Sequence, residues 1–550
     1  MMKKVLALLL ASALVFGLVA CSNSGGSGET KATEAATQAD TQKEETKAPE
    51  TEKAADTTAA PETDAPATEG GDTEPAPADT GDAYYCELIL PVMQPIPAQE
   101  EIQKVEDAIN DHILNDLGVT DVKMHLTFAS LSDYSTNMAM DLAAGAKHDI
   151  ILAFPFNTWQ SNGYMTNLDP YLDNELSGAM GVLPKDWDLC GKVGKSIYAI
   201  PCYKGLSLSW KWFYDHAYVD GVIDPSTVKD LDSLEAALTT LKEKYPDEHF
   251  IVFPNQLVSL ENFVDHTSQI GTYTATVGDD TTIVNYYATD AYKRGITRAY
   301  NWVQNGWCDP EGSNNTLGHD ALVLSGSAKG VIMGHAYSIE TCDAMFDDNS
   351  KAHTENGIDF GCVQIGISDM ATNGLVYGIA YTSENPAAAA KLMNIIWTDE
   401  FVASALIYGL EGVSYVWNED HTSIEWPEGL NMGTVPYSAL YTCGAFGNQF
   451  LLYGMDSNTS EADKSFMKEL MDQAWYPRQF GFTPSTENVQ TQVAAVANVV
   501  SQYNTALTYG EENPEEVLPE FLAELEAAGI NDIIADYQAQ LDAWLAENGK

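Results

Sequence analysis

Basic residues are scarce in this chain of 550 residues, which has 27 Lys and Arg against 80 Asp and Glu and a formal net charge of −53. Surfaces that bind nucleic acid or anionic lipid headgroups need clustered Lys and Arg. The charge therefore excludes nucleic acid as a partner and favours a neutral or cationic ligand. Beyond the first 20 residues no apolar run approaches the ~20 residues that span a bilayer, so we expect a body outside the membrane.

The sequence also lacks the common catalytic signatures. It contains no G-x-S-x-G, H-E-x-x-H, G-x-x-x-x-G-K-[ST] or G-x-G-x-x-G motif. Residues 309–320 have oxygen-bearing side chains at calcium-loop spacing, but they lack the sixth-position glycine and end in Asp rather than Glu. We therefore assign no metal site and predict no cofactor and no enzymatic activity, and calcium binding at residues 309–320 stays open. The possibility that two carboxylates lie at the distance used by glycoside hydrolases stays open, because acidic residues are so numerous.

Cysteine usage excludes a structural zinc site. The chain has no C-x-x-C and its cysteines are widely scattered. The number that follows Cys21 is odd, so these cysteines cannot all pair within one chain. The possibility of a single disulfide stays open, and we expect the cysteines to be buried free thiols. The cysteines after Cys21 are Cys86, Cys190, Cys202, Cys308, Cys342, Cys362 and Cys443.

The chain begins with a leader that is typical of export. Lys3 and Lys4 precede an apolar run over residues 5–20, which is too short to span a bilayer comfortably. The run ends in Leu-Val-Ala-Cys, and this ending resembles a bacterial lipobox. Two acyl chains on Cys21 would give stable anchoring where one gives only reversible binding. We predict a signal peptide over residues 1–20 and lipidation of Cys21.

Residues 22–82 contain no aromatic residue and no Val, Ile, Leu or Met. A segment that cannot bury apolar surface cannot offset the entropy of ordering. We predict a lipidated cysteine and a disordered tether over residues 21–82, with a soluble body that works outside the membrane.

The body begins with alternating strand and helix patterns. A buried strand over residues 84–94 precedes a helical pattern that stops at Gly118, in which Ile102, Val105, Ile109, Ile113, Leu114 and Leu117 are apolar. An alternating strand, a second helix and a short apolar strand ending at Pro155 follow. This order predicts a doubly wound α/β layer, whose ligands lie beyond the carboxyl ends of the strands.

Five segments resemble, in order, the extracellular solute-binding proteins of ABC importers. They are "LAAGAKHDIILAFPFNTWQSNGYMTNLDPYLD", "GKVGKSIYAIPCYKGLSLSWKWFYD", "STVKDLDSLEAALTTLKEKYP", "ALVLSGSAKGVIMGH" and "GIAYTSENPAAAAKLMNIIWTDEFVASALIYGLEGVSYVW". The ending resembles a lipoprotein branch that binds sugars or oligosaccharides and carries a C-terminal extension. There we expect two packed helices, one from Asn513-Pro514 to Gly529 and one from Asn531 with Ile534, Tyr537, Leu541 and Trp544 on a buried stripe.

The resemblance implies a type II periplasmic-binding-protein-like fold with two α/β lobes, hinge strands and a helical C-terminal extension. Lobe 1 would comprise residues 83–205 and 378–440, and lobe 2 residues 206–377 and 441–550. The implied function is that of a lipid-anchored binding component on the outer face of the cell membrane, which captures a sugar by hinge closure and delivers it to permease subunits. Alternatives are a secreted glycan hydrolase, a binder of peptide or other solute, and an adhesin or wall protein, although no repeats favour the last.

Candidate ligand residues come from loops after strands and from the crossover between lobes. A sugar needs flat aromatic faces and a few fixed polar groups. Each candidate also has a structural reading: Trp210 or Trp212 belongs to the core, Lys204 is a solvated charge, His335 is a structural histidine, and Glu411 caps a turn at Gly412. The candidates are Asn157, Trp159, Gln160, Tyr203, Lys204, Trp210, His335, Tyr337, Glu411 and Tyr415.

Overall fold

The structure is a computed structural model, and it describes residues 83–93, 95–310, 312–314, 326–336, 359–372, 374–431, 433–440, 446–455 and 460–550. The predicted signal peptide, Cys21, the predicted tether and Tyr337 lie outside the described residues, as does most of the calcium-like segment 309–320.

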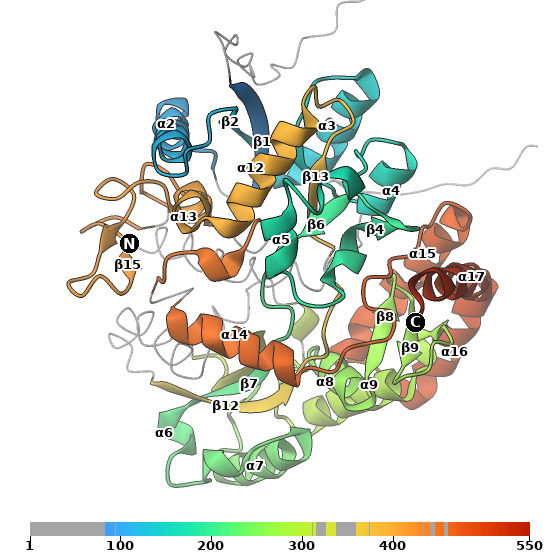
Figure 1. The fold of residues 1–550 in the computed structure, drawn as a ribbon. Helices are drawn as coiled ribbons and strands as arrows, with labels where there is room; N and C mark the ends of the chain where they lie inside the picture. The colour runs from blue at the N-terminus through green and yellow to red at the C-terminus, as the bar shows by residue number, and fades with distance from the viewer. Residues whose placement is uncertain are drawn as a thin grey trace, which may run out of the picture. The chain divides into compact units, whose positions relative to one another are not determined.

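The first half of the body forms the predicted α/β layer (Figure 1). A five-stranded sheet has the order β2-β1-β3-β13-β6, in which β1 is parallel to β2 and β3 while β13 is antiparallel to β3 and β6. The doubly wound prediction is confirmed by the chain order β1 (Tyr84–Val92), α2 (Gln99–Asn115), β2 (Val122–Ser130), α3 (Leu131–Ala144) and β3 (Ile150–Leu152). The sheet is completed by β6 (Ala199–Pro201) and β13 (Val376–Ile379).

Helix α2 shows where the periodic pattern held and where it failed. Ile102, Val105 and Ile109 are buried at helical spacing, and Ile113 continues the stripe. Leu114 and Leu117, which were expected on the same stripe, are 42% and 38% exposed. Leu114 is one residue, about 100°, from Ile113 around the helix, and Leu117 lies beyond the helix end, so neither faces the sheet.

The second sheet is antiparallel and has the order β11-β7-β12. Every residue of its central strand β7 (Ser209–Asp215) is buried, including Trp210 and Trp212. The expectation that one of these tryptophans belongs to the core is met by Trp212, and Trp210 is only 8% exposed. A central strand is covered on both faces, so both of its side-chain rows are removed from water. The flanking strands are β11 (Gly330–His335) and β12 (Phe360–Ile367).

Helices and short elements cover both sheets. Around the first sheet lie α4 (Phe156–Ser161), α5 (Ser177–Val182), the short helix η2 (Trp187–Gly191), α12 (Pro386–Thr398) and α13 (Glu400–Tyr408). Around the second lie α6 (His216–Val219), α7 (Leu231–Lys244), α8 (Leu257–Asp265) and α9 (Asp290–Gln304). Further elements are β4 (Lys192–Val193), β5 (Ser196–Ile197), β8 (Thr267–Ile270), β9 (Thr274–Val277), β10 (Val284–Asn285), β14 (Val416–Trp417), β15 (Ile424–Glu425) and α14 (Glu461–Gln473).

The predicted C-terminal helices are present. The chain ends in α15 (Gln490–Thr508), α16 (Pro514–Ala527) and α17 (Ile530–Asn548), which pack beside α9 and the small sheet β10-β9-β8. The Asn513 side chain caps α16 by accepting from the Glu515 backbone N–H. Tyr537 and Leu541 are buried in a common core with α9, and Ile534 and Trp544 pack against it, as the stripe predicted. Throughout the part of the chain that the structure describes, no helix has the length and apolarity needed to cross a membrane.

Candidate functional site

Two chain segments connect the sheets, and they hydrogen-bond to each other. Residues 202–208 run from β6 to β7, and residues 368–372 and 374–375 lie between β12 and β13. The Cys202 N–H donates to the Leu375 carbonyl over 3.0 Å, and the Ser368 N–H donates to the Leu208 carbonyl over 2.9 Å. The two crossing segments therefore act as a paired connection.

Residues that follow α13 join this connection from a third direction. Tyr203 forms a short parallel bridge with Asn448, in which the Tyr203 N–H donates to Gly447 and the Gln449 N–H donates to Tyr203. After α14, the Trp475 carbonyl accepts from the Met370 N–H over 2.9 Å. We call the meeting point of these segments, residues 202–208, 368–372 and 474–480, the junction.

A histidine, a carboxylate and an indole come together at the junction. His266 ends α8 in the left-handed region, with φ 52°. Its Nδ1 lies 2.8 Å from Asp369 Oδ1, and its ring stacks on Trp475 with centroids 4.6 Å apart and an interplanar angle of 17°. His266 remains 40% exposed and Trp475 is half-buried, so solvent reaches the group.

The junction holds polar atoms whose hydrogen-bonding capacity is unused. Asp369 is 11% exposed, and its buried Oδ2 has no hydrogen-bond partner among the described residues. Burial raises the pKa of Asp369, partly offset by His266. Gln479 Oε1 in the junction, and Thr267 Oγ1 in the residue after His266, are likewise buried without a partner in the described chain. Buried polar groups are normally satisfied, and an orphan acceptor needs a water or a ligand to complete it.

Several predicted residues lie at or near the junction. Tyr203 is half-buried, edge-on to Trp187 with centroids 5.5 Å apart, and Lys204 is half-exposed beside it. Trp210 lies on β7 with its ring against Gly334. His335 faces Ser209 on the next strand and is 5% exposed, and burial together with Lys211 lowers its pKa to about 3. His335 and Trp210 are therefore both buried side chains of the second sheet, at the end of β7 that follows the first crossing segment.

The three residues predicted on the loop after β3 lie on α4. The Asn157 amide donates to the Thr483 carbonyl over 2.6 Å, and Gln160 is half-buried. Trp159 is 1% exposed and packs against Tyr134, with ring centroids 6.1 Å apart. The short helix turns its largest apolar side chain into the core, so in this structure the Trp159 ring presents no face to solvent.

The remaining predicted residues lie elsewhere. Glu411 is exposed and bridges to Tyr415, which is 4% exposed and packs edge-on to Tyr453. Both belong to the turn that leads into the β14–β15 hairpin. Tyr337 lies outside the described residues. The ligand assignment of all ten residues stays a prediction.

Sequence reasoning missed His266, Asp369 and Trp475. Asp369 had a usable signal, because it follows the apolar strand β12 in the way Asn157 follows β3. His266 and Trp475 had none, since they come from segments more than 100 residues apart along the chain. Only tertiary structure brings them together.

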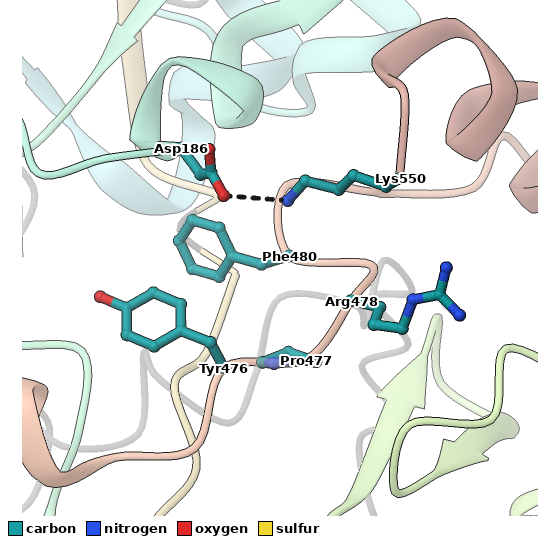
Figure 2. A pocket seen from close by; sticks show the side chains of 6 residues that line it. All are labelled: Asp186, Tyr476, Pro477, Arg478, Phe480 and Lys550. Carbon is teal, nitrogen blue, oxygen red and sulfur yellow. Dashed lines mark ion pairs between the residues drawn. The ribbon is translucent and has the colours of Figure 1, made fainter.

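A pocket of about 350 Å³ lies next to Tyr476, the residue after Trp475. Figure 2 shows Asp186 facing Lys550 across it, with their charged atoms 3.3 Å apart, while Arg478 points away from this pair. The Asp186 carboxylate and the Lys550 ammonium already pair with each other within this pocket. We therefore interpret the pocket as a structural contact rather than a ligand site. It is lined by Asp186, Tyr476, Pro477, Arg478, Phe480 and Lys550.

Comparison with known families matches residues 116–403 to the family described as bacterial extracellular solute-binding protein, over more than half of the chain. The chain belongs to this family. The match covers the first sheet from β2 onward, both crossing segments and the second sheet, whereas β1 and α2 precede it. Residues 478–546, which include α15, α16 and all but the last two residues of α17, match a separate domain of unknown function, DUF3502.

Named relatives agree with the family. A carbohydrate ABC transporter substrate-binding protein of Streptococcus pneumoniae is 22% identical over 431 residues, covering 77% of this chain and 84% of the relative. The crystal structure of the N-glycan transport solute-binding protein NgtS from S. pneumoniae has a TM-score of 0.67 at 20% identity, covering 86% of this chain and all of NgtS. NgtS in complex with Man5GlcNAc has a TM-score of 0.56 at 19% identity, with coverage of 86% and 100%.

These likenesses establish the fold as the two-lobed α/β fold of solute-binding proteins, as predicted. The family is one of binding proteins, and its description places its members outside the cell.

Proposed function

We propose that this solute-binding protein is the substrate-binding component of a carbohydrate ABC importer, which captures a sugar or oligosaccharide between its lobes and delivers it to permease subunits. The family match and the transporter relative support this role. NgtS complexes with Man1GlcNAc and Man5GlcNAc support a saccharide ligand. Hydrolysis is not part of the role, and the family of binding proteins supports that reading.

The observation that carries the proposed site is the orphan carboxylate oxygen of Asp369 beside the stacked ring of Trp475. Sugar hydroxyls are donors that an ionised carboxylate accepts, and sugar C–H faces pack on aromatic rings. His266 fixes the Asp369 carboxylate through its other oxygen. We place the ligand at the junction, where Tyr203 and Lys204 lie within the same crossing segments, and we retain the other predicted residues as second candidates.

Hinge closure about the crossing segments is the proposed mechanism. The three NgtS structures share one protein, yet their TM-scores against this chain are 0.67, 0.57 and 0.56, and the two lower values belong to the glycan complexes. A spread within one protein reflects a difference of conformation, which supports lobe movement on ligand binding in this fold.

The tether and anchor complete the proposal. Cleavage after residue 20, lipidation of Cys21 and a disordered segment to residue 82 would hold the body on the outer face of the membrane within reach of the permease. The lobe limits are also proposed. Phe446, Leu452, Met471 and Phe480 pack in the core of the first sheet, so we assign residues 446–455 and parts of 467–480 to the first lobe rather than the second.

The test is calorimetric titration of the purified chain with Man5GlcNAc, followed by a panel of neutral glycans, acidic glycans and peptides. We expect a glycan to bind with micromolar or tighter affinity, and Trp475→Ala to weaken binding by about 10- to 100-fold, the loss of one stacking platform. Trp426→Ala is the matched control, because Trp426 is a half-buried indole that packs against the core of the first sheet, outside the junction. It should leave affinity unchanged.

Other outcomes would redirect the proposal. Binding of peptides without binding of any glycan would contradict the saccharide class, and release of a shortened glycan during titration would favour the hydrolase. Glycan binding that survives Trp475→Ala but is lost in Tyr415→Ala or Asn157→Ala would move the site away from the junction.

A further inference from the structure

The C-terminal extension is tied to both lobes by one short run of chain. Residues 479–483 alternate between different neighbours. Phe480 is 1% exposed and packs in the core of the first sheet, whereas Phe482 is 8% exposed and packs in the core of the extension against Trp544. Two phenylalanines two residues apart thus anchor in two separate cores.

Polar contacts of the same run fix its other residues. The Gln479 amide donates to Thr276 Oγ1 on β9 over 2.7 Å, with both residues buried. The Gly481 N–H donates to Thr372 Oγ1 in the second crossing segment over 3.2 Å. The Thr483 carbonyl accepts from Asn157 on α4. Residues 479, 481 and 483 therefore contact β9, the second crossing segment and helix α4 of the first lobe, respectively.

Gly481 shows how closely the run passes the first lobe. Its φ of 93° lies in the left-handed region, and a Cβ added there would lie 2.5 Å from Leu189 in η2. Only glycine satisfies both conditions. The residue lies where the backbone is pressed against η2.

A second tie reaches the other end of η2. Lys550 forms an ion pair with Asp186, the residue before η2 (Figure 2). Its ammonium also lies 5.7 Å from the centroid of the Trp544 ring on α17. Helix η2 packs tightly on β6, since a Cβ on Gly191 would overlap the Ala199 carbonyl. Strand β6 continues directly into the first crossing segment.

We propose that residues 479–483, together with the Lys550–Asp186 pair, form a clip through which the C-terminal extension restrains bending at the crossing segments. This inference rests on the proposed hinge function. The extension packs on α9 and β10 of the second lobe, while the clip holds η2 and α4 of the first lobe. Bending at residues 202–208 and 368–372 moves these attachments apart, so the extension sets the balance between open and closed forms.

Hydrogen exchange of the ligand-free full chain tests the clip without any sugar. The Thr372→Val, Lys550→Met double variant removes one contact from each tie. We expect amides in peptides covering residues 202–208 and 366–372 to exchange at least threefold faster than in the parent chain. Lys391→Met is the matched control, since it removes a Lys–Asp pair between Lys391 and Asp121 that lies within the first lobe, and it should leave these peptides unchanged.

Two results would overturn the proposal. In one, exchange rises only at residues 479–483 and the crossing segments are unaffected, which makes the run a simple structural attachment. In the other, exchange is unchanged everywhere, which shows that these contacts restrain nothing. Phe482→Ala, which removes the anchor in the extension core, is the second variant and should give the larger increase. If the parent chain binds no glycan, the proposed function is contradicted. The exchange rates of the variants then still decide whether the clip restrains the crossing segments.

Discussion

Two inward-facing carboxylates differ in how their oxygens are satisfied. Glu261 on α8 is 3% exposed, and its two oxygens accept from Arg294 and Arg298 over 2.7 and 2.6 Å. Asp369 at the junction is 11% exposed, and only one of its oxygens has a partner among the described residues. A fully paired carboxylate stabilises a lobe, whereas a half-paired one is ready to accept a further donor. The comparison separates the part of the protein that holds shape from the part that recognises ligand.

The largest effect is expected at Glu261. Glu261→Ala leaves two arginines without their shared buried acceptor, and among the described residues Arg298 keeps its pairs with Asp232 and Glu235. Removing one partner of a buried pair costs about 3–5 kcal/mol, and partial exposure of the arginines reduces this to about 2–4 kcal/mol of unfolding free energy. Urea denaturation measures the loss. A loss below about 0.5 kcal/mol would show that the ion pairs do not stabilise the fold. The glycan affinity of the folded variant should equal that of the parent chain.

Asp369 should show the reverse pattern. Asp369→Asn keeps the shape but replaces the orphan acceptor oxygen by an amide, so we expect about tenfold weaker glycan binding, the loss of one charged hydrogen bond. Because burial raises the pKa of Asp369, its ionisation disfavours the folded state as pH rises through the folded pKa. The variant should therefore be at least as stable as the parent at pH 7 in thermal melts. Unchanged glycan affinity together with reduced stability would show that Asp369 stabilises the fold and does not bind the ligand.

A third carboxylate, Glu106 on α2, provides a pH-dependent case. It accepts from the Leu126 N–H and lies 3.2 Å from His125 Nδ1, and this hydrogen bond raises the pKa of His125. The stability gained from protonated His125 is present below its unfolded pKa of about 6.5 and is lost as pH rises through the higher folded pKa. We expect His125→Gln to cost about 1 kcal/mol at pH 6 and less at pH 9. A cost independent of pH in urea titrations would show that packing, not charge, matters there.

The smallest effect is expected at the surface. Lys391 pairs with Asp121 and lowers the pKa of that carboxyl, and the two side chains are 36% and 58% exposed. Exposed pairs contribute little, so Lys391→Met should change the unfolding free energy by less than about 0.5 kcal/mol. The change should shrink further in 0.5 M salt. A cost above 1 kcal/mol at low salt would weaken the distinction between buried and exposed carboxylates.

The fold was accessible from the sequence because its signals are local. Strand alternation in residues 122–128, the stripe of α2 and the Asn513 cap of α16 each depend on neighbours a few residues away. Leu114 and Leu117 were misplaced because the exact end and rotation of a helix depend on what it packs against.

The candidate site was less accessible because it depends on contacts across the chain. Tyr203 and Lys204 could be placed on a crossing segment, since the strand before them was readable. The stacking of His266 on Trp475, and the missing partner of Asp369 Oδ2, arise only when three distant segments meet. Trp159 shows the same dependence: its position after β3 predicts a ligand contact, which stays a prediction, and only the tertiary structure shows that α4 turns its ring into the core.

Fluorine NMR of the chain labelled with 5-fluorotryptophan tests the central claim most directly. The chain has 11 tryptophans, and Trp475→Phe and Trp302→Phe variants assign two of the signals. Trp302 is fully buried in the second lobe and serves as the internal reference. On titration with Man5GlcNAc, or with the glycan of the panel that binds most tightly, we predict that the Trp475 signal shifts to saturation while the Trp302 signal stays fixed. Saturable glycan binding with an unmoved Trp475 signal would contradict a ligand site at the junction.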